Sequence, residues 1–88
     1  MYDYELEKPK IFTDDGIKIL LRIRDGIHKH FETSCAIYLL DAINNFSASY
    51  GGNWFHLACV DFLLEIGDIV EITREGIPTQ SRILLKRF

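Results

Sequence analysis

Apolar positions recur at helical spacing between residues 14 and 31, and Thr13 precedes them as a side chain that can cap free helix N–H groups. At about 100° per residue, apolar side chains gather on one face and charged ones on the other. The apolar face holds Ile17, Leu20, Leu21, Ile27 and Phe31, widened by Ile19 and Ile23, and the charged face holds Lys18, Arg22, Asp25 and Lys29. We therefore predict a helix over this segment.

The same segment also fits a β-hairpin. Alternate residues from Ile17 to Ile23 are apolar, and Asp25-Gly26 is a typical hairpin turn. Because the apolar face continues to Phe31, the length of the pattern favours the helix.

Two further helices are predicted, at residues 35–46 and 54–66. In the first, Ser34 is the capping residue, and the apolar residues at helical spacing are Ala36, Leu39, Leu40 and Ile43. A loop containing Gly51-Gly52 follows, and Asn53 caps the next helix. Gly67 ends that helix, because glycine suits the left-handed turn that often follows a last helical turn.

The C-terminal part of the chain predicts a two-stranded β-hairpin. Residues 69–73 and 82–87 are rich in β-favouring side chains, and a polar loop with Gly76 and Pro78 joins them. Residues 1–12 alternate apolar and acidic side chains and predict an arm, a short edge strand or a frayed terminus. The fold class is therefore α+β, with one domain over residues 13–88 behind an N-terminal arm.

Composition limits the function classes. With 88 residues, of which 48% are hydrophobic, the chain can build one small core but not a cleft between two domains. Cys35 and Cys59 both lie in apolar runs, where free thiols behave as small hydrophobes, so we expect no disulfide. Neither an export signal nor a long apolar run is present, and we expect a cytoplasmic protein with reduced thiols and no membrane partner.

The charge is unevenly distributed. The net charge is −3, which argues against non-specific binding to nucleic acid or to an anionic membrane. No Lys or Arg lies between Lys29 and Arg74, whereas the C-terminal end is basic. The residues that could contact phosphates from the hairpin are Arg74, Arg82, Lys86 and Arg87; the alternative is a solvated edge strand whose charges discourage edge-to-edge pairing.

Three helices followed by a hairpin wing resemble the winged helix-turn-helix superfamily. The resemblance rests on residues 60–72, where the Leu-rich end of the third helix passes through Gly67 into a strand, and on the strand that returns to Phe88. In DNA-binding members of this superfamily the third helix enters the major groove and the wing contacts phosphates. The resemblance implies that the helix at residues 54–66 corresponds to that third helix. This chain departs from that pattern, because Asp61 and Glu65 would meet phosphate with like charge.

The predicted helix at residues 54–66 is apolar on nearly every side. Such a helix must be buried nearly all round, either by its own domain or by another chain. We expect a surface for self-association or for a protein partner here, with a homodimer as the leading arrangement. The expected interface residues are Trp54, Phe55, Cys59 and Phe62. The alternative is that the first two helices and the N-terminal arm cover this helix.

Two polar residues, Arg24 and His28, fall one turn apart on the inward face of the first predicted helix. A guanidinium there needs a carboxylate, because an unpaired buried charge is costly. We predict a buried ion pair between Arg24 and Asp61, with Asp41 and Glu65 as alternative partners.

No catalytic motif or metal-ligand spacing is recognisable. His28, His30, Cys35, His56 and Cys59 are the nitrogen and sulfur ligands, but they lack the local pairs of a zinc finger or ribbon. We expect no enzyme, no metal and no cofactor. The leading hypothesis is a non-enzymatic interaction module. The alternatives are a DNA-binding regulator that uses the wing and the first helix, and a metal or ligand sensor built on Cys35, His56 and Cys59.

Overall fold

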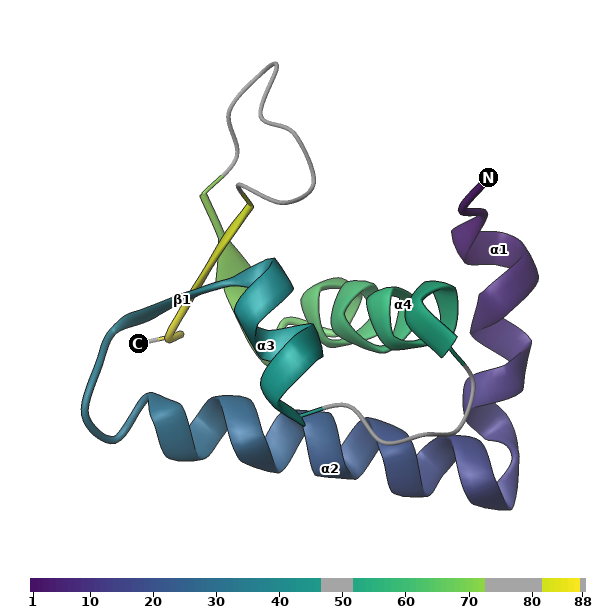
Figure 1. The fold of residues 1–88 in the computed structure, drawn as a ribbon, viewed down its shortest axis with the longest axis horizontal. Helices are drawn as coiled ribbons and strands as arrows, with labels where there is room; N and C mark the ends of the chain where they lie inside the picture. Colours follow the sequence, from purple (N-terminus) through teal and green to yellow (C-terminus); the bar gives the residue numbers. More distant parts are fainter. Residues whose placement is uncertain (47–51, 73–81, 88) are drawn as a thin grey trace.

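In this computed structural model a long helix lies along one edge of the molecule, and three of the other helical elements pack against it (Figure 1). The structure describes residues 1–46, 52–72 and 82–87, with four α-helices, one 3-10 helix and a three-stranded antiparallel sheet. In chain order these are α1 (Tyr4–Glu7), η1 (Lys8–Phe12), α2 (Asp14–His30), β1 (Ala36–Tyr38), α3 (Leu39–Phe46), α4 (Gly52–Glu65), β2 (Val70–Glu71) and β3 (Ile83–Leu85). The α+β class is confirmed.

Helix α2 confirms the helical prediction against the hairpin. The hydroxyl of Thr13 accepts a hydrogen bond from the Gly16 N–H at 3.0 Å and donates to the Lys10 carbonyl at 2.9 Å, which fixes the helix start. The inward face is narrower than predicted, because Ile17 and Leu21 lie at its edge and are 43% and 47% exposed. The buried side chains of α2 are Ile19, Leu20, Ile23 and Ile27.

The sheet contains a strand that the sequence analysis missed. Residues 36–38 pair with β3, and the helix predicted from residue 35 begins only at Leu39. Ile37 is buried opposite Leu84, so pairing with β3 overrides the helical spacing of the apolar residues in this segment. The predicted pairing of the two C-terminal strands is confirmed, with β3 between β1 and β2. Arg74 and the loop between the strands lie outside the described residues.

The N-terminal segment is helical instead of an extended arm or edge strand. The Asp3 carboxylate caps α1 by accepting hydrogen bonds from the N–H groups of Glu5 and Leu6, and Pro9 fits the first turn of η1. Both elements contact α4, and Ile11 is fully buried in the core. Residues 1–12 are therefore a packed part of the fold.

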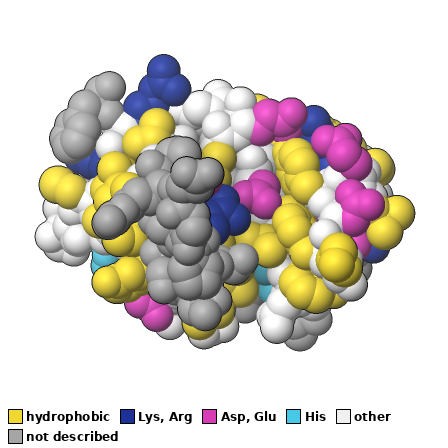
Figure 2. Space-filling model, turned by 90° about the horizontal axis from the view of Figure 1, so that it is seen from above, with side chains coloured by type: hydrophobic (Ala, Val, Ile, Leu, Met, Phe, Trp, Pro, Cys, Tyr) yellow, Lys and Arg dark blue, Asp and Glu magenta, His cyan; other side chains and the backbone are white. Residues whose placement is uncertain are grey.

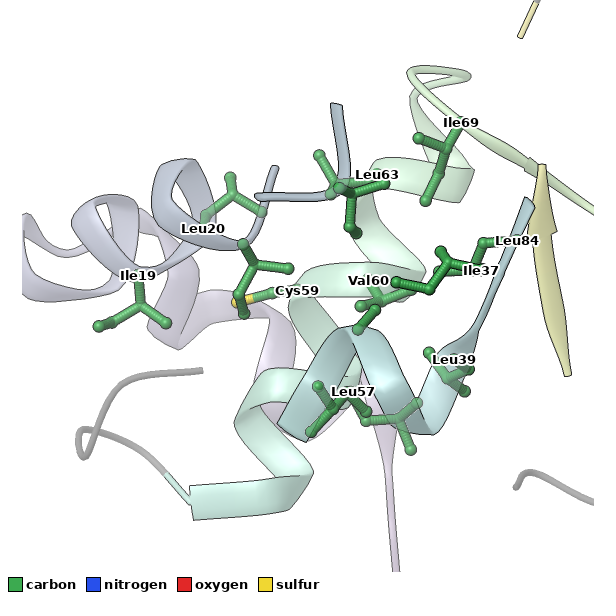
Figure 3. Packing of buried hydrophobic residues seen from close by; sticks show 14 of the residues in the cluster. Ile19, Leu20, Ile37, Leu39, Leu57, Cys59, Val60, Leu63, Ile69 and Leu84 are labelled. Atoms are coloured by element: carbon green, nitrogen blue, oxygen red, sulfur yellow. The ribbon is translucent and has the colours of Figure 1, made fainter. Parts of the chain in front are cut away.

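The core lies between α2, α4 and the sheet (Figure 3). Helix α4 contributes the largest share, and its end at Gly67 has the predicted positive φ of 78°. Side chains from α2, α3 and the sheet converge on α4, among them Leu20, Leu39 and Leu84. The buried residues of α4 are Phe55, His56, Leu57, Ala58, Cys59, Val60 and Leu63.

The corner between η1 and α2 depends on a residue without a side chain. A Cβ atom added at Gly16 would lie 2.0 Å from the Lys10 carbonyl oxygen and 2.9 Å from that of Ile11. Because both neighbours are backbone atoms, the clash cannot be relieved by turning a side chain.

We expect Gly16→Ala to lower the free energy of unfolding by about 1–3 kcal/mol, since the added methyl group overpacks this corner. Urea denaturation measures the change. Arg22→Ala is the control, because it places alanine at an exposed position of the same helix and should shift stability by about 0.5 kcal/mol at most. Equal stabilities of the two variants would contradict the steric explanation.

Candidate functional site

Two of the four predicted interface residues belong to the core. Phe55 is 1% exposed and Cys59 is fully buried, so the expectation that they form an interface is wrong. The reason is that α1, η1, α2 and α3 all pack against α4 and bury it within its own chain. Burial also raises the pKa of the Cys59 thiol to about 12, so at neutral pH this thiol is protonated.

The outward face of α4 is covered by the N-terminal segment. The Tyr2 hydroxyl donates a hydrogen bond to Asp61 Oδ2 at 2.7 Å, and the Tyr4 hydroxyl donates to Glu65. Lys8 Nζ forms an ion pair with Glu65 Oε1 at 2.9 Å. Figure 2 shows acidic side chains gathered among hydrophobic ones at the end of the molecule where α1 lies. This face is therefore acidic and already occupied by residues of the same chain.

The predicted ion pair between Arg24 and Asp61 is wrong. Arg24 Nε instead donates to Asp68 Oδ1 at 3.0 Å, and His28 Nε2 lies 2.6 Å from Asp68 Oδ2. Asp61 lies on the outward face of α4, where it accepts hydrogen bonds from Tyr2 and from Arg82. The helical wheel placed Arg24 correctly on the side toward α4, but the turn after α4 supplies the carboxylate.

Arg82 joins the sheet to α4. Its Nη2 atom contacts Asp61 Oδ1 at 2.8 Å and Glu71 Oε1 at 2.9 Å, and its Nε atom contacts Glu71 Oε2 at 2.9 Å. The side chain is 20% exposed. Two carboxylates thus neutralise a guanidinium that the sequence analysis considered as a phosphate contact, so Arg82 has a structural role.

The remaining basic residues at the C-terminal end, Lys86 and Arg87, are exposed. Arg87 Nη1 donates to the Gly67 carbonyl at 2.7 Å. Together they border a hollow of about 330 Å³ whose other lining residues are His28, Phe31, Glu32 and Asp68. Two carboxylates in this lining offset the two cations, so the hollow offers an anion no net positive charge.

Trp54 lies beside an apolar hollow between α3 and α4, which we call the α3–α4 hollow. Its lining is Leu40, Ile43, Asn44, Asn53, Trp54 and Leu57, and its volume is about 190 Å³. Trp54 is 52% and Leu40 46% exposed, whereas Ile43 and Leu57 are buried beneath them. The Tyr2 ring lies 5.8 Å from the Trp54 ring, so the N-terminal segment also supports this side chain. None of the lining residues carries a formal charge.

Phe62, the fourth predicted interface residue, lies on the opposite side of α4 from the hollow. It is partly buried, and its ring meets that of Phe12 edge to face at 5.5 Å. Of the predicted interface residues, only Trp54 is fully at the surface. Leu40 was missed as a surface residue because its exposure depends on where β1 ends and α3 begins, which the helical spacing did not reveal.

Among the residues that the structure describes, no three His, Cys, Asp or Glu side chains come together in a way that could hold a metal ion. His28, His30, Cys35, His56 and Cys59 thus form no such group. No helix in the described ranges is long and apolar enough to cross a membrane. The chain matches no protein-family model, no curated protein and no solved structure. A proposal for its function therefore depends on the surfaces of the chain itself.

We expect Arg82→Ala to lower the free energy of unfolding by about 2–3 kcal/mol, because Asp61 and Glu71 would then face each other without a cation. Urea denaturation of this variant and of Lys86→Ala provides the comparison. Lys86 is exposed, and its truncation should change stability by about 0.5 kcal/mol or less. A mild effect of Arg82→Ala would show that the Arg82 contacts stabilise the fold little.

The Asp68 carboxylate makes stability depend on pH. Burial raises its pKa, but the hydrogen bonds from His28 and Arg24 outweigh burial and hold the pKa below the ordinary value. Such a group stabilises the fold above its unfolded-state pKa of about 4, and the contribution is lost as the pH falls through the lower folded-state pKa. We expect Asp68→Asn to be about 1 kcal/mol less stable than the wild type at pH 7.

This difference should narrow as the pH falls below about 4, where the wild-type carboxyl group also becomes protonated. Urea denaturation at neutral and acidic pH measures the gap. Glu32→Gln is the control, because this substitution also removes one carboxylate from the same region but does so at an exposed residue. A gap that stays constant down to acidic pH would rule out a role for the Asp68 charge.

Proposed function

We propose that this chain is a non-enzymatic protein-interaction module that receives an apolar side chain of a partner protein in the α3–α4 hollow. The observation that carries the proposal is the half-exposed Trp54, which stands beside an uncharged hollow with a buried apolar floor. Exposed aromatic anchors in charge-depleted patches are typical of the centres of protein interfaces.

The size of the hollow supports a side chain as the occupant. Small-molecule and cofactor sites usually measure roughly 300–1,000 Å³. The α3–α4 hollow measures about 190 Å³, which suits a single aliphatic or aromatic side chain better than a whole cofactor. Trp54 is supported by Tyr2, so little ordering is needed when a partner docks.

The order of elements supports a winged-helix architecture for the module. After α2 come β1, α3, α4 and the strands β2 and β3, and the sheet order is β1-β3-β2. In this interpretation α4 occupies the position of a recognition helix. A DNA-binding role is less well supported, because Tyr2, Tyr4 and Lys8 cover the outward face of α4 and Arg82 is engaged by two carboxylates.

Charge indicates the chemistry of the partner. No Lys or Arg occurs between Lys29 and Arg74, and the exposed Asp41 lies in the first turn of α3, next to Leu40. A partner segment with Lys or Arg beside its apolar anchor would therefore complement this surface, and an acidic segment would be repelled. We propose an apolar anchor flanked by basic residues as the docking motif.

Selection from a random-peptide display library tests the proposal. We expect the wild-type protein to enrich peptides with an aliphatic or aromatic anchor next to Lys or Arg. Trp54→Ala should weaken the selected peptides at least about tenfold, because it removes one wall of the α3–α4 hollow. Titration by fluorescence anisotropy with a labelled peptide measures the change.

Tyr38→Ala is the matched control, since Tyr38 is an aromatic residue with 53% exposure outside the lining of the hollow. It should change peptide affinity by less than about twofold. Enrichment of no peptide, or equal binding to the Trp54→Ala variant, would overturn the proposed function.

A further inference from the structure

The three-stranded sheet has a second face, turned away from the core, that is apolar throughout. Side chains alternate between the two faces of a sheet, so the buried Ile37, Ile69 and Leu84 mark the face that packs on the core (Figure 3). Residues opposite each other on neighbouring strands share a face. The other face, which we call the outer sheet face, therefore holds two rows across β1, β3 and β2: Ala36, Leu85 and Val70 in one, and Tyr38, Ile83 and Ile72 in the other.

This face lacks the polar side chains that a solvated sheet usually carries. Antiparallel sheets with one face in water typically alternate apolar and polar residues along each strand. Here the charges lie on the core side, because Arg82 contacts both Glu71 and α4. Tyr38, Val70 and Ile72 are nevertheless 53%, 38% and 39% exposed. The strands thus have the composition of a sheet covered on both faces, whereas the described part of the chain covers only one.

We infer that the outer sheet face binds the same face of a second copy of the chain, so that the two sheets pack face to face about a two-fold axis. Sheets packed in this way lie about 10 Å apart, with the side chains of both inner faces interdigitated. A two-fold interface brings identical patches together, and an uncharged patch does so without repulsion in a chain of net charge −3. The inference does not depend on the proposed docking at the α3–α4 hollow, because the two surfaces share no residue.

The charges at the border of the face select the direction of the axis. Within two residues of the rows, and apart from Arg82 and Glu71 on the core side, the described charges are Asp68, Lys86 and Arg87; Arg74 lies outside the described residues. All three lie beyond the row that contains Leu85. An axis parallel to the strands would set this end over the same end of the other copy, with Arg87 opposite Arg87. An axis across the strands, between the two rows, places the two charged ends at opposite ends of the interface and avoids this repulsion.

The sizes of the side chains select the same axis. An axis across the strands turns one row over the other, so Tyr38 of one copy faces Ala36 of the other and Ile72 faces Val70. Large side chains that face small ones interdigitate well. An axis parallel to the strands would instead set Tyr38 against Ile72 and leave a gap between Ala36 and Val70. The outer sheet face therefore complements itself in one arrangement.

The size of the face sets the expected affinity. Three strands about 4.8 Å apart and two rows about 7 Å apart make a face smaller than the roughly 800 Å² that each partner contributes to a standard interface. Burial of apolar surface holds the copies together, and the limited area keeps the dimer weak. We expect a dissociation constant between about 10 μM and 1 mM.

NMR spectroscopy of the full chain over a range of concentrations tests the inference, with translational diffusion as the measure of the dissociation constant. Amide signals of β1, β2 and β3 are expected to shift most as the concentration rises. In a mixture of isotope-labelled and unlabelled chains, contacts between copies should join the Tyr38 ring to the Ala36 methyl group. Contacts between copies that join Tyr38 to Ile72 instead would overturn the proposed axis.

Ile72→Lys should raise the dissociation constant at least about tenfold, because it places an ammonium group inside an uncharged interface. Ile66→Lys is the matched control, since Ile66 is 58% exposed and lies outside the outer sheet face, and it should leave the dimer intact. Circular dichroism and urea denaturation confirm that both variants are folded. Tyr38→Ala should weaken the dimer, whereas Trp54→Ala should not, which separates this test from that of the hollow.

A wild-type chain that stays monomeric at about 2 mM would overturn the inference, because it would place the dissociation constant above the expected range. Equal dissociation constants for the wild type and Ile72→Lys would overturn it too. Loss of the dimer in Trp54→Ala, with no effect of Ile72→Lys, would place self-association at the α3–α4 hollow instead.

Discussion

The rest of the structure depends on burying α4, a helix with apolar side chains on most of its circumference, inside a chain of 88 residues. Helices α2 and α3 leave its outward face open, and the N-terminal segment, with α1 and η1, closes it. Asp61 and Glu65 on that face need hydrogen-bond donors. Tyr2 donates to Asp61, and Tyr4 and Lys8 donate to Glu65. The first residues of the chain thereby complete the core and also support the Trp54 side chain.

Strong local signals allowed a good part of the fold to be predicted. The capping residue and long apolar face of α2, the turn at Gly67 and the β-favouring runs around β2 and β3 all depend on neighbours in sequence. Strand β1 was missed because its pairing with Leu84 and Leu85 comes from the other end of the chain. The helical N-terminal segment was missed because its stability comes from packing on α4, and its short alternating pattern fits a strand equally well.

The candidate site could be predicted only in part, for a related reason. The sequence shows that the helix at residues 54–66 is apolar all round, but not whether its own chain or another one buries it. The structure places Phe55 and Cys59 in the core and leaves Trp54 beside a hollow that Leu40 of α3 completes. The positions of the cations were evident from the sequence, but their ion-pair partners were not. The carboxylates that bind Arg82 and Arg24 lie in distant elements.

Asp61 accepts one hydrogen bond from Tyr2, near the beginning of the chain, and another from Arg82, near its end. Both termini are thus tied to one carboxylate on the central helix. Detachment of the N-terminal segment removes a donor from Asp61 and changes the electrostatic balance around Arg82, which also holds β2 through Glu71. The N-terminal segment and the sheet are therefore linked through Asp61 and Arg82, and we expect amide hydrogen exchange at the start of the chain to be coupled to exchange in the sheet.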